Sequence, residues 1–401
     1  MACPYVVTIP HPLLATVRPL LTHPPLPRLS ANPSQAKHLS TLPHNIYTLY
    51  LFTAADFPTF AIPTTLFALF ASLSGAPLTT NPTPALLPTL ARVLLALTVT
   101  WANLLLFNIS NQRSPTAVVE DSVNKPTRPL PAGRLSCDSA RRLLLCLAPA
   151  VMLLSWAMGV WEECLLQLAF TWLYNDLGGC DEHWLLRNGL IALGYGLYSS
   201  AALRVMAGPE HTVTPHGLHW IGVVTAAMFA TQHICDIKDA AGDALRGRQS
   251  APIVLGDNVV RWSVAVPILL SSTFCAWFFA SGVPAYVATL GMGALVAFRT
   301  LAYRDLKSDN KTWKLWALWT VGLFLLPLVE NPDVFGRAWV DLRTALWCVL
   351  CEDERCEMLD LAAVSGVAMV VEWRRMYAQG VRAVGNESIL GIVAESAARP
   401  M

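Results

Sequence analysis

The sequence is poor in charge. Of its 401 residues, 14% are Asp, Glu, Lys or Arg, whereas ordinary soluble proteins carry about 25%. The hydrophobic share is 54%, and the mean hydropathy is +0.46. The formal net charge is +1, so the chain lacks the basic excess of nucleic-acid-binding proteins. These values exclude an ordinary water-soluble enzyme, predict no nucleic-acid partner, and indicate a polytopic membrane protein.

The sequence also lacks a cysteine framework and a signal peptide. Its ten cysteines are scattered, and most lie in apolar runs, where Cys behaves as a small hydrophobe. Residues 1–45 are rich in proline and contain no apolar core followed by a small-residue cleavage site. We expect this segment to be a disordered leader.

Long apolar runs are present, and they show no alternation of polar and apolar residues. Runs of about 17–25 residues are long enough to cross a bilayer as helices, and the missing alternation argues against a barrel. We therefore predict an all-α polytopic membrane protein with about nine transmembrane helices. The expected spans are 48–74, 86–108, 142–161, 164–177, 188–207, 216–235, 262–281, 284–304 and 313–330.

Basic residues orient these spans. The loops after the second, fourth, sixth and eighth spans carry most of the Lys and Arg, which predicts that they face the cytosol. We expect a multi-pass protein of the endoplasmic reticulum bilayer, with a catalytic domain over 46–330. Residues 331–401 form a predicted tail, in which 357–372 is an interfacial helix or, as the alternative, a tenth span.

One acidic cluster follows the sixth span. Asp236, Asp239 and Asp243 are spaced i, i+3, i+7 and so share one face of a helix. Carboxylates beside lipid are rare without a function, and three on one face repel each other unless a cation lies among them. Mg²⁺ bound by one or two carboxylates and by substrate phosphates suits this pattern. The expected diphosphate donors beside them are Lys238, Arg246 and Arg248.

A second cluster follows the second span. Asn108 and Asn111 come first, then Glu120 and Asp121, and all four are candidate Mg²⁺ ligands. The alternative for the two asparagines is a capped helix C-terminus. The candidate diphosphate ligands that follow are Asn124, Lys125 and Arg128. The predicted catalytic acids are Asp121, Asp236, Asp239 and Asp243.

These two clusters together resemble the motifs of the UbiA superfamily of intramembrane prenyltransferases. Its first motif ends in Asp, followed by Asn-Lys-Pro-x-Arg-Pro-x-Pro-x-Gly, which Asp121 and the residues from Asn124 to Gly133 match. Its second motif, Asp-x-x-Asp-x-x-x-Asp, is intact at Asp236. The resemblance covers roughly 46–330. It implies a nine-helix bundle with a central cavity, Mg²⁺ as cofactor and a prenyl diphosphate as substrate.

The first motif departs from the family pattern, because Ala117 and Arg113-Ser114 stand where earlier acids are typical. In this respect the chain is similar to fungal UbiA-type membrane terpene cyclases of secondary metabolism. That resemblance implies ionisation of a prenyl diphosphate, farnesyl diphosphate, and cyclisation of the carbocation in terpenoid biosynthesis. The alternative is a prenyltransferase that attaches the prenyl chain to an aromatic or other acceptor.

A carbocation requires a dry cavity, and aromatic faces attract cations. Plain helix packing is the alternative for every aromatic residue, so none is assigned a role. The candidates are Trp101, Phe107, Phe170, Trp172, Tyr174, Tyr195, Tyr198, Trp220 and Phe229. A transporter is a third reading, although transporter sites usually lie near the middle of the membrane. The sequence indicates neither the product skeleton nor the oligomeric state.

Overall fold

The structure, a computed structural model, describes residues 42–329. Most of the predicted leader and all of the predicted tail lie outside this range. Residues 47–329 belong to one compact unit, and they form a bundle of helices without a strand in the described range. The fold class predicted from the sequence, an all-α membrane protein, is confirmed.

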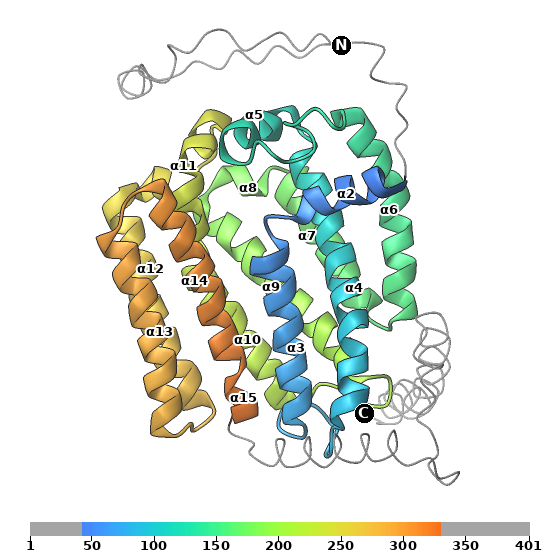
Figure 1. The fold of residues 1–401 in the computed structure, drawn as a ribbon, viewed down its shortest axis with the longest axis vertical. Coiled ribbons are helices and arrows are strands. Elements are labelled where there is room, and N and C mark those ends of the chain that lie inside the picture. Colours follow the sequence, from blue (N-terminus) through green and yellow to red (C-terminus); the bar gives the residue numbers. More distant parts are fainter. Residues whose placement is uncertain (1–41, 330–401) are drawn as a thin grey trace, which may run out of the picture. The chain divides into compact units, whose positions relative to one another are not determined.

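Long helices form the body of the bundle (Figure 1). They are α3 (Ile62–Ser74), α4 (Leu86–Gln112), α6 (Cys137–Ala157), α7 (Trp161–Asn175), α9 (Trp184–Ala207), α10 (Pro215–Thr231), α12 (Ala251–Phe278), α13 (Val283–Ala302) and α14 (Leu306–Phe324). The shorter elements are α2 (Leu42–Thr53), the π-helix η2 (Phe57–Ala61), α5 (Pro115–Asn124), α8 (Gly179–Glu182), α11 (Ile234–Arg246) and α15 (Leu326–Val329).

The number of membrane spans differs from the expected nine. Within residues 42–329, seven helices are long and apolar enough to cross a membrane, or eight if the bent pair α10–α11 is one span. One difference is α7, which has 15 residues and is shorter than the 17 or so that a bilayer requires. The count of nine is therefore not confirmed.

The expected first span, 48–74, is not one helix. α2 ends at Thr53, and the chain then passes through η2 before α3 begins at Ile62. Pro58 lies in the first turn of η2 and has no backbone N–H to continue a helical ladder. The break brings Asp56 to the wall of a cavity.

Short helices gather at one end of the bundle, where Figure 1 shows α5, α8 and α11 together. Ser114 begins α5, since its side chain accepts a hydrogen bond from the Ala117 N–H at 3.1 Å. α11 is bent by 46° from α10, and it ends at Gly247, whose φ of +80° suits glycine. α5 packs against α11.

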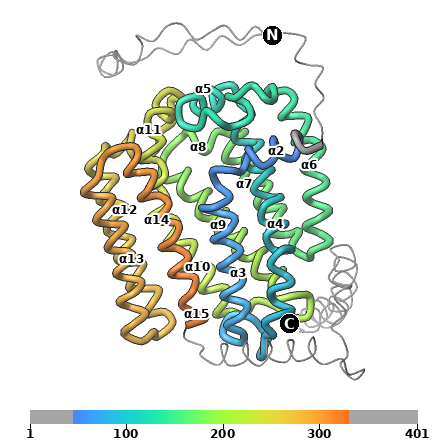
Figure 2. Tube along the Cα trace, in the orientation of Figure 1, coloured from blue at the N-terminus to red at the C-terminus, as the bar shows by residue number. Residues whose placement is uncertain are grey.

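One flank of the bundle, at the left of Figure 2, consists of α12, α13 and α14, which lie side by side in the trace. Its interior holds large buried side chains, among them Trp316 and Trp319. Their indole N–H groups donate to Thr231 at 3.1 Å and to Ser272 at 2.9 Å. Both polar atoms are thereby satisfied inside an apolar core, which fixes α14 against α10 and α12.

Candidate active site

A cavity of about 470 Å³ opens beneath the short helices. Its walls carry six basic side chains and three acidic ones, a formal excess of three positive charges. The basic residues are Lys125, Arg128, Arg187, Lys238, Arg248 and Lys314, and the acidic residues are Asp56, Glu120 and Asp239. Three acids behind the wall pair with three of these cations, so the site as a whole is close to neutral, while the cations at its surface still offer donors to an anionic ligand.

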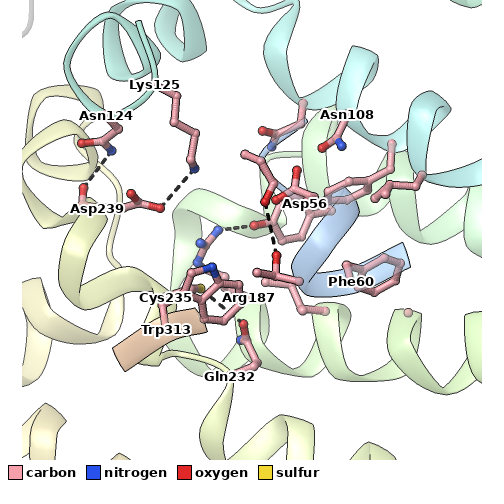
Figure 3. A pocket seen from close by; sticks show the side chains of 18 of the residues that line it. Asp56, Phe60, Asn108, Asn124, Lys125, Arg187, Gln232, Cys235, Asp239 and Trp313 are labelled. Atoms are coloured by element: carbon pink, nitrogen blue, oxygen red, sulfur yellow. Dashed lines mark hydrogen bonds and ion pairs between the residues drawn. The ribbon is translucent and has the colours of Figure 1, made fainter. Parts of the chain in front are cut away.

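The loop after α5 is joined to α11 at the cavity wall (Figure 3). Asn124 Nδ2 donates to the backbone oxygen of Asp239 at 2.9 Å, and its Oδ1 accepts from the Gly242 N–H at 3.1 Å. Lys125 Nζ lies 3.1 Å from Asp239 Oδ2, and Lys238 Nζ lies 2.8 Å from the same oxygen. The two predicted clusters therefore meet, and one carboxylate holds two ammonium groups at the wall.

Asp236 does not line the cavity. It is fully buried and pairs with Arg187 of α9, with Nη2–Oδ1 at 2.6 Å and Nε–Oδ2 at 3.3 Å. Arg187 also donates to the hydroxyl of Tyr174 on α7, and both of these residues line the cavity. In this arrangement Asp236 orients a cation toward the ligand space.

Glu120 of α5 binds Arg246 and Arg248, two arginines that come after the acids of α11 in the sequence. Its carboxylate accepts from Arg246 at 3.0 Å and from Arg248 at 2.9 Å. Burial opposes its charge, but the two guanidinium groups outweigh burial and hold the pKa of Glu120 below its usual range. Asp181 binds the same two arginines at 2.9 and 3.1 Å. The four side chains form a closed ion network that joins α5, α8 and the end of α11.

Arg128 is held by a different pair of acids. Its Nη1 donates to both carboxylate oxygens of Asp121, at 2.8 and 3.0 Å, and its Nη2 lies 3.6 Å from Oδ2 of Asp56. Burial raises the pKa of Asp121 above its usual value, because one guanidinium group does not fully offset the lost hydration. Asp121 itself is absent from the cavity lining, whereas Arg128 and Asp56 belong to it.

Amide side chains line the wall beside these ions. Asn111 Nδ2 donates to Asn175 Oδ1 at 2.9 Å, which ties α4 to α7. Asn108 is buried, its Nδ2 has no hydrogen-bond partner, and Figure 3 shows its side chain turned toward the cavity. The Asn108 amide is thus open to a ligand.

Aromatic rings form the apolar part of the cavity. Phe60 meets Tyr195 and Tyr198 edge to face, with ring centroids 4.5 and 4.8 Å apart. Of the aromatic residues expected there, five line the cavity: Phe107, Phe170, Tyr174, Tyr195 and Tyr198. Four are absent from the lining: Trp101, Trp172, Trp220 and Phe229.

Most, but not all, of the predicted site residues reach the cavity wall. Those that line it are Asn108, Asn111, Glu120, Asn124, Lys125, Arg128, Lys238, Asp239 and Arg248. Those that stand behind it, bound to these or to other lining residues, are Asp121, Asp236, Asp243 and Arg246. Their assignment as ligands or catalytic groups stays a prediction.

Several wall residues were not proposed from the sequence, among them three that carry charge or pack beside a charge. Asp56 is an acid inside the first apolar run, and such an acid is a functional signal that could have been used. Arg187 directly precedes an apolar run, where a basic residue indicates a loop charge that orients the span and gives no signal of a site. Trp313, whose ring lies 6.0 Å from Lys238 Nζ, carries no sequence signal that separates it from core tryptophans.

The donors at the wall fit Mg²⁺ in one particular way. Within residues 42–329, no three His, Cys, Asp or Glu side chains come together as a metal site, and Asp239 and Glu120 already have cationic partners. The hard oxygens at the wall are few, and the unpartnered atom of Asn108 is its Nδ2, which can donate to a phosphate oxygen but is not a ligand for the metal. This set fits an ion held by one or two carboxylates and mainly by substrate phosphate oxygens, and does not form an all-protein cage.

Known proteins are similar to this chain in sequence. Residues 60–324 match the UbiA prenyltransferase family. Somaliensene A/B synthase of Streptomyces somaliensis is 30% identical over 286 residues, covering 70% of this chain and 91% of its own. Fumagillin beta-trans-bergamotene synthase of Aspergillus fumigatus is 28% identical over 292 residues, with coverage of 70% and 91%.

A solved structure shares the fold. It is a UbiA homolog from Archaeoglobus fulgidus bound to GPP and Mg²⁺, with a TM-score of 0.50 and 12% sequence identity over 70% of this chain and 99% of that one. At this identity the likeness concerns the fold alone. The family match covers more than half of the chain, and the protein is therefore a member of the UbiA prenyltransferase family.

Proposed function

We propose that this protein is a magnesium-dependent membrane terpene cyclase that ionises farnesyl diphosphate and cyclises the resulting carbocation. The observation that carries the proposal is a single cavity with a cationic end and an aromatic end. A diphosphate head matches the first, and an isoprenoid chain matches the second. Similarity to two terpene synthases at 28–30% identity supports the same class of reaction.

Binding begins with the diphosphate at the cationic end. Lys125, Lys238 and Arg248 donate hydrogen bonds to its oxygens, while Asp239 keeps the two lysines in place. Asp239 and the side-chain oxygen of Asn108 would help to hold Mg²⁺ together with phosphate oxygens, and the ion would supply further neutralisation of the leaving group. Arg187, oriented by buried Asp236, adds a guanidinium group on the same side.

Ionisation breaks the allylic C–O bond, and the electron pair leaves with pyrophosphate. The cationic side chains stabilise the charge that develops on the pyrophosphate in the transition state. The carbon chain then lies among Phe60, Tyr195 and Tyr198, whose ring faces stabilise a cation and exclude water. Ring closure followed by loss of a proton gives a cyclic hydrocarbon and pyrophosphate.

The test is incubation of membranes containing the protein with farnesyl diphosphate and Mg²⁺ in the absence of an acceptor. A cyclic C15 hydrocarbon that requires Mg²⁺ supports the proposal. Product formed only when an aromatic acceptor is added points instead to the prenyltransferase alternative, which similarity to polyprenyl transferase eriF of Hericium erinaceus (27% identity) keeps in view. We further propose residence in the endoplasmic reticulum with the ion-rich end cytosolic, which epitope accessibility in permeabilised cells tests.

A further inference from the structure

Three exposed lysines follow one another at the start of α14. Lys307, Lys311 and Lys314 are spaced i, i+4, i+7 and share one face of the helix. From first to last they extend along about 10 Å of the helix axis. They line an open pocket together with Leu306 and Asn310.

The acids on the same helix do not neutralise these lysines. Asp309 is buried and binds Arg261 with both oxygens, at 2.9 and 3.0 Å. Asp305 caps the helix by accepting from the Ser308 N–H at 3.0 Å. Within residues 42–329, the three ammonium groups have no hydrogen bond or ion pair. Their charge is therefore available to a ligand.

The lysine pocket adjoins the candidate active site. Leu306, Asn310 and Lys314 line both it and the main cavity. One turn further on, Trp313 packs near Lys238 Nζ, at 6.0 Å from its ring centroid. The lysine pocket is thus continuous, through the wall that Lys314 shares, with the cavity whose lining also includes Lys238.

We propose that Lys307, Lys311 and Lys314 form an entry site that captures the diphosphate head of the substrate at the mouth of the cavity. This inference rests on the proposed function. Attraction by unpaired charges raises the rate at which the diphosphate head meets the protein. The head then moves along the wall shared by the two pockets to Lys238 and stays beside positively charged side chains. Lys307 and Lys311 stand outside the main cavity, so their contribution concerns capture and not chemistry.

The experiment measures association of a fluorescent prenyl diphosphate analogue with the purified full-length protein in neutral detergent. The variant is Lys307→Gln/Lys311→Gln, and the control with the same change of charge is Arg141→Gln/Arg142→Gln, an exposed pair at the start of α6 that binds Asp138 and lines neither pocket. At low salt the association rate constant should fall roughly three- to ten-fold in the lysine variant, at the lower end of charge-steering effects. The dissociation rate constant and kcat should stay as in the wild type.

Salt provides the second readout. At about 1 M ionic strength, where the screening length is about 3 Å, the lysine variant and the wild type should associate at the same rate. An unchanged rate at low salt, a defect that persists in high salt, or an equal defect in the control would overturn the proposal.

Two further measurements distinguish lipid binding from substrate capture, and substrate capture from the chemical step. In discs of neutral lipid the defect should remain. If it occurs only when anionic lipid is present, the lysines bind lipid headgroups and the entry site is refuted. Association with inorganic pyrophosphate is measured alongside turnover, so that a protein that captures diphosphate but forms no product overturns the proposed function and not the entry site.

Discussion

The buried pair of Asp236 and Arg187 gives the sharpest prediction. Asp236 is fully buried, and its two contacts hold the Arg187 guanidinium at 2.6 and 3.3 Å. Removing one partner of such a pair leaves a charge uncompensated in the interior, at a cost of about 3–5 kcal/mol. Asp236→Asn should therefore lower the free energy of unfolding by about that amount, toward its lower end because Tyr174 still accepts from Arg187.

The assay is thermal unfolding of the purified protein in detergent. At roughly 2–4 °C per kcal/mol for a large domain, a loss of about 3–5 kcal/mol lowers Tm by about 6–20 °C. The double variant Asp236→Leu/Arg187→Met removes both charges and should unfold at a higher temperature than Asp236→Asn alone, because no charge is left unpaired. An unchanged Tm for Asp236→Asn, or a double variant less stable than the single one, would refute the reasoning.

The remaining predictions concern the cavity wall. Asp239→Asn should abolish pyrophosphate release and should lower Tm by less than Asp236→Asn does, because the two lysines that lose their partner line the cavity and can turn toward it; a fall in Tm as large as that of Asp236→Asn would contradict this. Lys125→Ala should lower kcat/KM by about 10- to 150-fold, the loss of one charge-assisted hydrogen bond of about 1.5–3 kcal/mol; Michaelis–Menten kinetics with an unchanged KM would count against a role in diphosphate binding. Gly242→Ala places a Cβ 2.3 Å from Asn124 Nδ2, so KM should rise as the loop after α5 shifts, whereas Gly222→Ala, which meets no atom within 4 Å, serves as the neutral control. Tyr195→Phe should retain turnover and Tyr195→Ala should change the product mixture; identical mixtures by gas chromatography would exclude this ring from shaping the cation.

The sequence was sufficient to predict that the two clusters lie at one end of the bundle. Span count and basic loops placed both clusters on one side, and the structure joins them through Asn124, Lys125 and Asp239. Each span carries the chain from one side of the membrane to the other. Two loops separated by an even number of spans therefore lie on the same side. The resemblance to the family motifs then indicated which residue types to expect at that end of the bundle.

The sequence was not sufficient to assign a role to each acid. Spacing puts Asp236, Asp239 and Asp243 on one face of α11, yet only Asp239 lines the cavity. The other two are buried against Arg187 and Arg248. Which acid faces the ligand depends on the rotation of α11 and on a cation contributed by α9, and neither is encoded within the motif.

The break in the first span was missed for a related reason. Residues 48–74 are apolar enough overall to read as one helix, and hydropathy averages over Asp56 and Pro58. In the structure Asp56 lies between α2 and η2, Pro58 lies in the first turn of η2, and Asp56 is 3.6 Å from Arg128. The single acid Asp56 inside the apolar run therefore indicated the break in the helix, whereas the mean hydropathy of the run did not.

The central claim is that a prenyl diphosphate is ionised where Lys125 and Asp239 meet. Pyrophosphate release from farnesyl diphosphate, measured without any acceptor for the wild type and Asp239→Asn from matched preparations, tests it most directly. The account predicts magnesium-dependent release by the wild type and none above background by Asp239→Asn. Equal release by both proteins, or no release by the wild type, would contradict it.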